Sequence, residues 1–230
     1  MSAAFPNFPI TCQRYYLNLQ SNMKISNLIA GLLCLFLSFS CLASNRLTQT
    51  VTNTTVLDID GHELQADTNY YIHPTTSGNG GGLALASRDR TCPFYVMQEN
   101  LEPSNGLPLR FLTMENKQQF ISLSTDLNIV FYAATICVQS TAWRLGGIDE
   151  VTGRRYVMSG AVTGHPGIDT VRNWFKLEKY GGGNGYMIVF CPNVCSFCKV
   201  VCGNVGVFSE NGKRWLALSD QPLIVGFKKT

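Results

Sequence analysis

Residues 191–202 read Cys191-Pro192-Asn193-Val194-Cys195-Ser196-Phe197-Cys198-Lys199-Val200-Val201-Cys202. The four cysteines are nested symmetrically about the Ser196–Phe197 peptide bond. Residues nested in this way face each other across an antiparallel hairpin. Facing Cα atoms lie about 4.5–5.5 Å apart, within the range that a disulfide requires. The spacing therefore predicts two stacked disulfides, Cys195–Cys198 inside Cys191–Cys202, and it leaves Cys92 and Cys137 for a third. Because Ser196-Phe197 is a poor sequence for a two-residue primed turn, a looser loop is the alternative to a hairpin here.

Residues 23–43 have the features of a secretory signal peptide. Lys24 precedes an apolar run from Ile25 to Leu42, and small residues follow that run. A basic start, an apolar centre and small residues at the cleavage point are typical of such leaders. We therefore expect residues 1–43 to be an N-terminal extension, or an upstream start, followed by the signal peptide, and residues 44–230 to be the secreted domain. A membrane anchor is the alternative, because the run is about as long as a spanning helix.

Secretion determines how the cysteines are interpreted. Cys12, Cys34 and Cys41 would be lost with the leader, which leaves six cysteines, an even number in an oxidising compartment. In cytosol the same cysteines would favour a zinc or redox site, whereas in a secreted protein they predict disulfides, no metal and no cofactor. The sequon that begins at Asn53 predicts N-glycosylation there. The expected location is extracellular, in the apoplast or cell wall, with the vacuole as the alternative.

The charge and the motifs exclude several function classes. The chain has a formal charge of +3, and without Arg14 and Lys24 it is close to neutral. No block of like charges indicates a nucleic acid, or a membrane surface after signal cleavage, as a partner. There is no Gly-x-Ser-x-Gly or His-Glu-x-x-His motif, so we expect a protein that is not an enzyme. His62, His73 and His165 stand beside turn residues and are expected to be solvated.

Turn residues recur along the secreted part of the chain. Asp60-Gly61, Asn105-Gly106, Thr152-Gly153 and Asn211-Gly212 supply the positive φ values that tight hairpins need, and short apolar runs flank several of them. The glycine-rich run 78–82 is expected to be a flexible connection between strands. The pattern predicts an all-β domain of many short hairpins. Periodicity alone leaves a sandwich, a barrel and a trefoil open.

Several motifs resemble a known family. The run Val56–Leu64, followed after five residues by Tyr70-Tyr71-Ile72, resembles the N-terminal signature of the plant Kunitz (soybean-type) trypsin-inhibitor family. Further segments resemble its miraculin-like branch: 124–129, 136–141, 173–177, 191–199 and 216–220. The resemblance runs from about Leu47 to the C-terminus. It implies a β-trefoil of twelve short strands in three pseudo-repeats, stapled by the same three disulfides.

The resemblance also implies an activity in plant defence: substrate-like inhibition of serine endopeptidases through a loop on a rigid scaffold. Such a loop loses little ordering entropy on binding. The family's pattern places it in Glu99–Leu109, ahead of Arg110-Phe111, so the reactive-loop candidates are Leu107, Pro108, Leu109 and Arg110. The inhibitory position falls at Pro108. Leu107 would suit a chymotrypsin-like pocket, and Arg110 would suit the carboxylate of a trypsin pocket.

This sequence departs from the inhibitory pattern at two positions. Pro108 stands where a trypsin inhibitor requires Arg or Lys, and Ala66 stands where legume members have the Asn that braces the loop. The alternative interpretation of Leu107–Arg110 is the start of a strand. Two other functions remain open: inhibition of a papain-like cysteine protease through another loop, and a non-inhibitory role as a miraculin-like binding, taste-modifying or storage protein. The sequence makes no prediction of oligomeric state.

Overall fold

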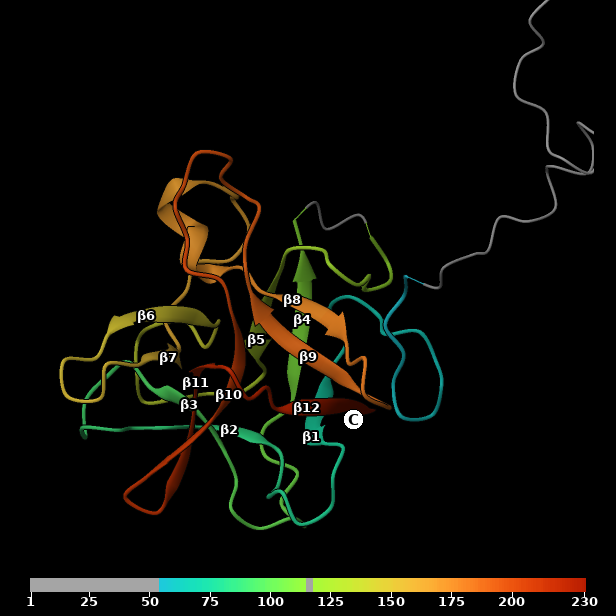
Figure 1. The fold of residues 1–230 in the computed structure, drawn as a ribbon, viewed down its shortest axis with the longest axis horizontal. Helices are drawn as coiled ribbons and strands as arrows, with labels where there is room; N and C mark the ends of the chain where they lie inside the picture. Colours follow the sequence, from blue (N-terminus) through green and yellow to red (C-terminus); the bar gives the residue numbers. More distant parts are fainter. Residues whose placement is uncertain (1–53, 115–117) are drawn as a thin grey trace, which may run out of the picture. The chain divides into compact units, whose positions relative to one another are not determined.

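Twelve short strands and one short 3-10 helix make up the computed structural model, which describes residues 54–114 and 118–230 (Figure 1). The expected signal peptide and the Asn53 glycosylation site lie outside the described residues. The elements are β1 (Tyr70–Pro74), β2 (Leu83–Ala86), β3 (Tyr95–Gln98), β4 (Leu109–Thr113), β5 (Leu127–Phe131), β6 (Arg144–Ile148), β7 (Arg155–Met158), η1 (Ile168–Asn173), β8 (Lys176–Lys179), β9 (Tyr186–Phe190), β10 (Gly203–Glu210), β11 (Lys213–Ser219) and β12 (Ile224–Lys229).

Six of the strands form a closed ring. β1 pairs with both β12 and β4, β4 pairs with β5, and β9 pairs with both β8 and β12. An isolated bridge between Leu127, at the start of β5, and Phe175, just before β8, joins the remaining two neighbours. Closure leaves the ring without a free edge, which is the way barrels satisfy their backbone groups.

The other six strands form three hairpins that meet at one end of the ring. The hairpins are β2–β3, β6–β7 and β10–β11. Their strands β3, β7 and β11 pair with one another in all three combinations. The chain thus repeats one four-stranded unit three times, as β1–β4, β5–β8 and β9–β12. This arrangement is a β-trefoil, and it resolves the choice that periodicity left open.

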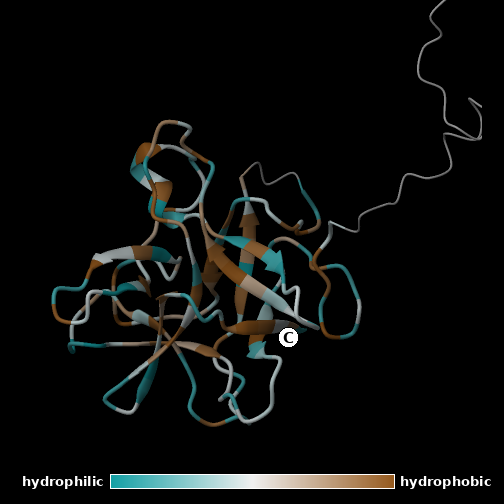
Figure 2. Ribbon diagram, in the orientation of Figure 1, coloured by the Kyte–Doolittle hydropathy of each residue, from teal (hydrophilic) through white to brown (hydrophobic). Residues whose placement is uncertain are grey.

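The core lies inside the ring, where hydrophobic residues from all three repeats converge (Figure 2). In β4 the alternation of a strand is clear, because Leu109 and Phe111 are fully buried while Arg110 between them is partly exposed. Aromatic rings meet edge to face, with centroids 5.4 Å apart for Phe111–Phe227 and 5.9 Å for Trp143–Phe175. Each fully buried side chain of this size contributes about 1.5–3 kcal/mol.

The turn between β10 and β11 follows the sequence prediction. Glu210 faces Lys213, and the two residues between them, Asn211 and Gly212, have φ values of 51° and 75°. Both values lie in the left-handed region that a two-residue primed turn requires. Asn-Gly therefore sets this hairpin's register locally.

The predicted symmetry of the cysteine-rich stretch 191–202 is confirmed, and the stretch itself is the looser loop, the alternative to a hairpin. The ladder between β9 and β10 pairs Phe190 with Gly203, about the same centre that the cysteines indicate. Residues 191–202, all of which the structure describes, contain no strand, so the cysteines lie in a loop beyond the ladder. The physical reason is that Ser196-Phe197 lacks the residues of a primed turn and Pro192 has no N–H to donate.

The three disulfides pair as the spacing predicts. Cys191 is joined to Cys202 and Cys195 to Cys198, with Cα atoms 4.5 Å and 5.4 Å apart. Cys92 is joined to Cys137, with Cα atoms 5.7 Å apart. In the part of the chain that the structure describes, no helix has the length and apolar character needed to cross a membrane.

Candidate functional site

The four reactive-loop candidates lie where the loop after β3 becomes strand β4. Leu109 is a fully buried core residue of β4. Leu107 is half-buried against the core, and its N–H donates to the carbonyl of Leu83 across 2.8 Å. The carbonyl of Pro108 accepts from the N–H of Tyr132, also at 2.8 Å. The backbone here is therefore held on both sides, as in the first residues of a strand.

The side chain of Arg110 is held against the barrel by three neighbours. Its Nη1 donates to Oδ1 of Asp67 at 2.8 Å, and its Nε donates to Oδ1 of Asn69 at 3.2 Å. Its guanidinium carbon lies 4.6 Å from the centre of the Tyr132 ring, in cation–π geometry. To enter a protease pocket, Arg110 would have to leave all three contacts.

The preceding loop, residues 99–106, is pinned to the glycine-rich run 78–82. The N–H of Glu99 donates to the carbonyl of Gly82 at 2.9 Å, and the N–H of Gly82 donates to the carbonyl of Ser104 at 2.8 Å. A Cβ on Gly82 would collide with the carbonyl of Asn105. The run is therefore not the flexible connection that was expected. Its glycines let two backbones approach more closely than side chains would permit.

A buried polar contact fixes the start of the same loop. Gln98 is fully buried, and its Nε2 donates to the carbonyls of Asn79 and Gly81 at 2.6 and 3.1 Å. Its Oε1 accepts from Nε and Nη2 of Arg214 at 3.0 and 2.8 Å. Every polar atom of the Gln98 side chain is thus satisfied, which makes the loop rigid where it leaves β3.

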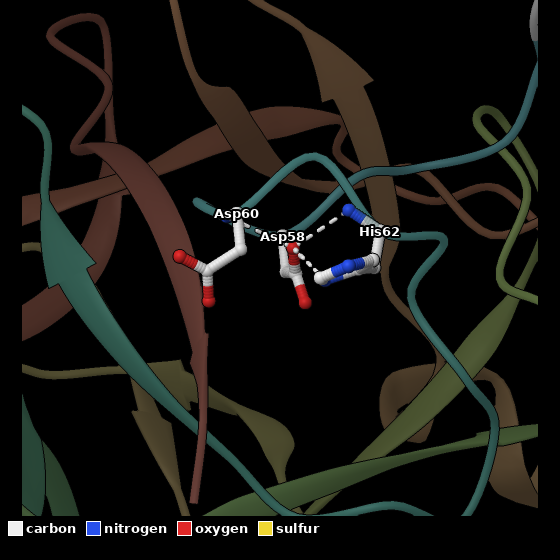
Figure 3. Close-up of side chains that lie close together, drawn as sticks. All are labelled: Asp58, Asp60 and His62. Atoms are coloured by element: carbon white, nitrogen blue, oxygen red, sulfur yellow. Dashed lines mark hydrogen bonds and ion pairs between the residues drawn. The ribbon is translucent and has the colours of Figure 1, made fainter.

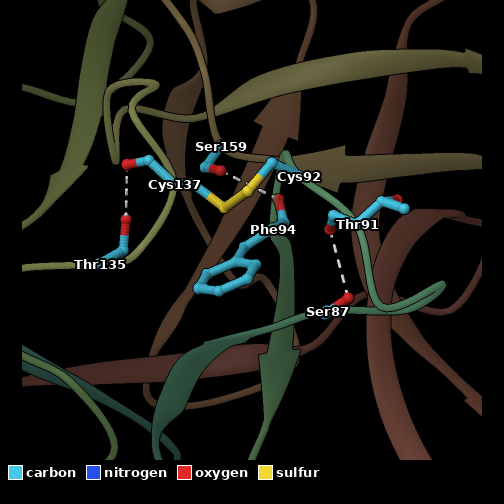
Figure 4. Close-up of a disulfide and its surroundings, with 7 residues drawn as sticks. All are labelled: Ser87, Thr91, Cys92, Phe94, Thr135, Cys137 and Ser159. Carbon is cyan, nitrogen blue, oxygen red and sulfur yellow. Dashed lines mark hydrogen bonds between the residues drawn. A yellow bond between two sulfur atoms is a disulfide. The ribbon is translucent and has the colours of Figure 1, made fainter.

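A second loop, residues 132–140, displays apolar side chains that are more exposed than Leu107 and Pro108. Ile136 and Val138 are 91% and 101% exposed, and they flank Cys137, which is itself buried. The disulfide from Cys137 to Cys92 anchors the middle of the loop, and Oγ1 of Thr135 donates to the carbonyl of Cys137 at 3.1 Å (Figure 4).

Both ends of loop 132–140 are also tied together. The N–H of Phe131 donates to the carbonyl of Thr141 at 3.4 Å, and Oγ1 of Thr141 donates back to the carbonyl of Phe131 at 2.6 Å. A loop closed at its base and anchored at its centre presents Ile136 and Val138 on a restrained backbone. Such a loop can enter the cleft of another protein with little loss of entropy.

Sequence reasoning missed Ile136 and Val138. One signal was available, because in an extended chain the two neighbours of a residue point to the opposite side from it. If Cys137 turns inward to form a disulfide, an apolar residue on each side of it is directed outward. The sequence shows this pattern, but exposure depends on whether another segment covers the loop.

The comparisons with known proteins agree with this fold. The family model Kunitz_legume, described as trypsin and protease inhibitor, matches residues 56–229. The chain belongs to this Kunitz family. The sequence resemblance to the plant Kunitz inhibitors is therefore confirmed.

Individual relatives of this Kunitz chain carry different names. Miraculin from Synsepalum dulcificum is 44% identical over 76% of this chain and 83% of that protein. Kunitz trypsin inhibitor 5 from Arabidopsis thaliana is 43% identical over 87% of this chain and 99% of that protein. The solved structure of the Kunitz-type cysteine protease inhibitor PCPI-3 from potato is 34% identical, with a TM-score of 0.67 over 76% of this chain and 97% of that one.

One group of possible metal ligands lies on a turn of this Kunitz domain. Ligand atoms of Asp58, Asp60 and His62 lie within 4.8 Å of one another (Figure 3). Oδ1 of the buried Asp58 already accepts from the backbone N–H groups of Asp60 and His62, at 3.0 and 2.9 Å. These bonds are those of a side chain that caps a turn, which gives Asp58 a structural role.

Of the histidines that were expected to be solvated, His62 and His73 lie in different environments. The His62 side chain is largely exposed on a turn, as expected. His73 instead lies on strand β1, half-buried, with its Nε2 buried and without a hydrogen-bond partner. Burial lowers the pKa of His73, and the nearby charge of Lys228 lowers it further, so the ring is neutral at pH 7.

Proposed function

We propose that this chain is a secreted protease inhibitor that acts in plant defence and is not an enzyme. The observation that carries the proposal is the match of residues 56–229 to the Kunitz inhibitor family. Two restrained loops on the barrel support it, because inhibition of this type requires a segment that already has its bound shape. Serine endopeptidases are the first target class, and the mature chain is proposed to begin near residue 44, with a glycan on Asn53.

For a serine protease, the proposed contact is the loop 99–108. Leu107 and Pro108 are half-buried at its end, and Leu101 is exposed at its turn. Leu109 and Arg110 are less suitable, since the first would have to leave the core and the second would have to leave Asp67. A chymotrypsin-like enzyme that accepts Leu107 is therefore favoured over trypsin.

A papain-like cysteine protease is the second candidate target, and loop 132–140 supports it. Ile136 and Val138 are exposed apolar side chains on either side of the anchoring cysteine of this loop. A structural relative of this chain is a cysteine protease inhibitor. The two routes use different loops, so variants can separate them.

The test is a tight-binding titration of the oxidised protein against trypsin, chymotrypsin and papain. The variant Leu107→Ala should weaken chymotrypsin inhibition at least tenfold if loop 99–108 is the contact. The double variant Ile136→Ser, Val138→Ser should weaken papain inhibition if loop 132–140 is the contact. The matched control is Val151→Ser, because Val151 is 91% exposed on the turn between β6 and β7.

Each result has a clear consequence. Stoichiometric inhibition of chymotrypsin, with a nick at Leu107 or Pro108 found by mass spectrometry, would establish the serine-protease route. Inhibition of papain alone would establish the second route. Failure to inhibit any of the three enzymes, with all three disulfides intact, would overturn the proposal and favour a binding or storage role. N-terminal sequencing and intact mass of the secreted protein test the proposed start and the glycan.

A further inference from the structure

We propose that the pocket beside the Cys195–Cys198 loop binds a small amphipathic anion, with one acidic head group on an apolar body. The pocket has a volume of about 430 Å³ and lies between η1 and the loop 191–202, against residues of β6, β7 and β9. These two segments stand side by side at the upper left of Figure 1. The volume falls in the range of small-molecule sites, about 300–1,000 Å³.

The charged side chains that line the pocket are all positive. Arg155, Arg172 and Lys199 line it, and no lining residue is acidic. Within the described residues, none of these three cations forms an ion pair or a hydrogen bond. A hollow lined by one sign of charge and by apolar walls concentrates the field and attracts the opposite charge.

The walls between these charges are apolar and exposed. Ile168, Phe197 and Val201 all line the pocket, and the Phe197 side chain is 76% exposed. Covering exposed apolar surface favours a complex, because it removes that surface from water. An inorganic ion would use only the cations, and a neutral apolar molecule would use only the walls. A carboxylate or sulfonate on an aromatic or aliphatic body uses both.

The pocket wall is held in place before any ligand arrives. The Cys195–Cys198 disulfide closes a short ring that contains Phe197, and Cys191–Cys202 closes a larger ring around it. The N–H of Asn193 donates to Oδ2 of the buried Asp126 at 2.9 Å, which ties the loop to the segment before β5. A preformed site loses little entropy on binding.

The proposal goes beyond protease inhibition and does not depend on it, because the pocket shares no residue with loops 99–108 and 132–140. The test uses the folded, oxidised protein and the fluorescent aromatic sulfonate 8-anilinonaphthalene-1-sulfonate. Decanoate, as a competitor, tests an aliphatic carboxylate. N-phenyl-1-naphthylamine, the neutral analogue, and inorganic sulfate test the apolar body and the charge separately.

Three variants locate the binding. Arg172→Gln and Lys199→Gln should each weaken sulfonate binding about three- to tenfold, and Phe197→Ser should weaken it as much by removing the wall. The matched control is Lys228→Gln, which removes the same charge from an exposed position on β12. Thermal unfolding of every variant shows whether the fold is retained, because partly unfolded proteins also bind this probe.

The expected result is one binding site per chain, displaced by decanoate and weakened by the pocket variants but not by Lys228→Gln. Three results would overturn the proposal: no binding, equal affinity for the neutral analogue, or an equal loss from Lys228→Gln. Displacement by sulfate alone, at concentrations where decanoate has no effect, would also overturn it, because the site would then recognise charge without an apolar body.

Discussion

Arg88 Nη1 lies 2.6 Å from Oδ2 of Asp149, and this ion pair joins two repeats of the trefoil. Arg88 follows β2 in the first repeat, and Asp149 follows β6 in the second. On its other side, Nε of Arg88 donates to Oε2 of Glu210 at 2.8 Å, at the end of β10 in the third repeat. One guanidinium therefore connects the three hairpins β2–β3, β6–β7 and β10–β11.

Replacing Arg88 tests this connection. The side chain is only 11% exposed, and its guanidinium carbon lies 4.4 Å from the centre of the Tyr156 ring. Arg88→Gln leaves two carboxylates without their cation, so we expect the free energy of unfolding to fall by about 2–3 kcal/mol. Chemical denaturation measures this change. The exposed Arg90→Gln is the control and should lie within about 0.5 kcal/mol of the wild type.

The same ion pair should be sensitive to acid. The hydrogen bond from Arg88, helped by the backbone N–H of Thr152, lowers the pKa of Asp149 to about 2. The folded pKa of Asp149 therefore lies below its unfolded value of about 3.9. The stability that the ionised Asp149 contributes is fully present above about pH 3.9, and it is lost as the pH falls through about 2. The difference in stability between the wild type and Asp149→Asn should therefore shrink between about pH 5 and pH 2. A difference that stays constant over this range would contradict the assignment.

The close approach at Gly82 should not tolerate a methyl group. Gly82→Ala places a Cβ against the carbonyl of Asn105 in a buried position, so we expect a loss of about 2–4 kcal/mol. Gly147→Ala is the control, because a Cβ there meets nothing within 4 Å. Thermal and chemical unfolding of both variants give the comparison. Equal stability of the two would show that residues 99–106 and 78–82 are not held together.

Arg110 should matter little for either stability or inhibition. Its side chain is 27% exposed and that of Asp67 is 67% exposed, so their ion pair is largely solvated. We expect Arg110→Gln to lower the free energy of unfolding by less than about 1 kcal/mol and to leave protease inhibition unchanged. A tenfold loss of trypsin inhibition in a titration would instead identify Arg110 as the residue that enters the protease.

Local chemistry was sufficient for several features. The symmetric cysteines of 191–202 indicate the centre about which β9 and β10 pair, and Asn211-Gly212 specifies its hairpin turn. These features could be predicted because they depend on residues close together in the chain, whose spacing and φ preferences are properties of the sequence. The motif at Val56–Leu64 indicated the Kunitz family, and membership of that family implied the β-trefoil fold.

Contacts between distant residues determined the rest. Whether Leu107 and Arg110 are available to a protease depends on Leu83, Asp67 and Tyr132, which contact them only in the folded chain. The exposure of Ile136 and Val138, the rigidity of 78–82 and the pocket beside Phe197 depend in the same way on which segments pack together. Burial and charge environment are properties of the assembled surface, so no local pattern encodes them.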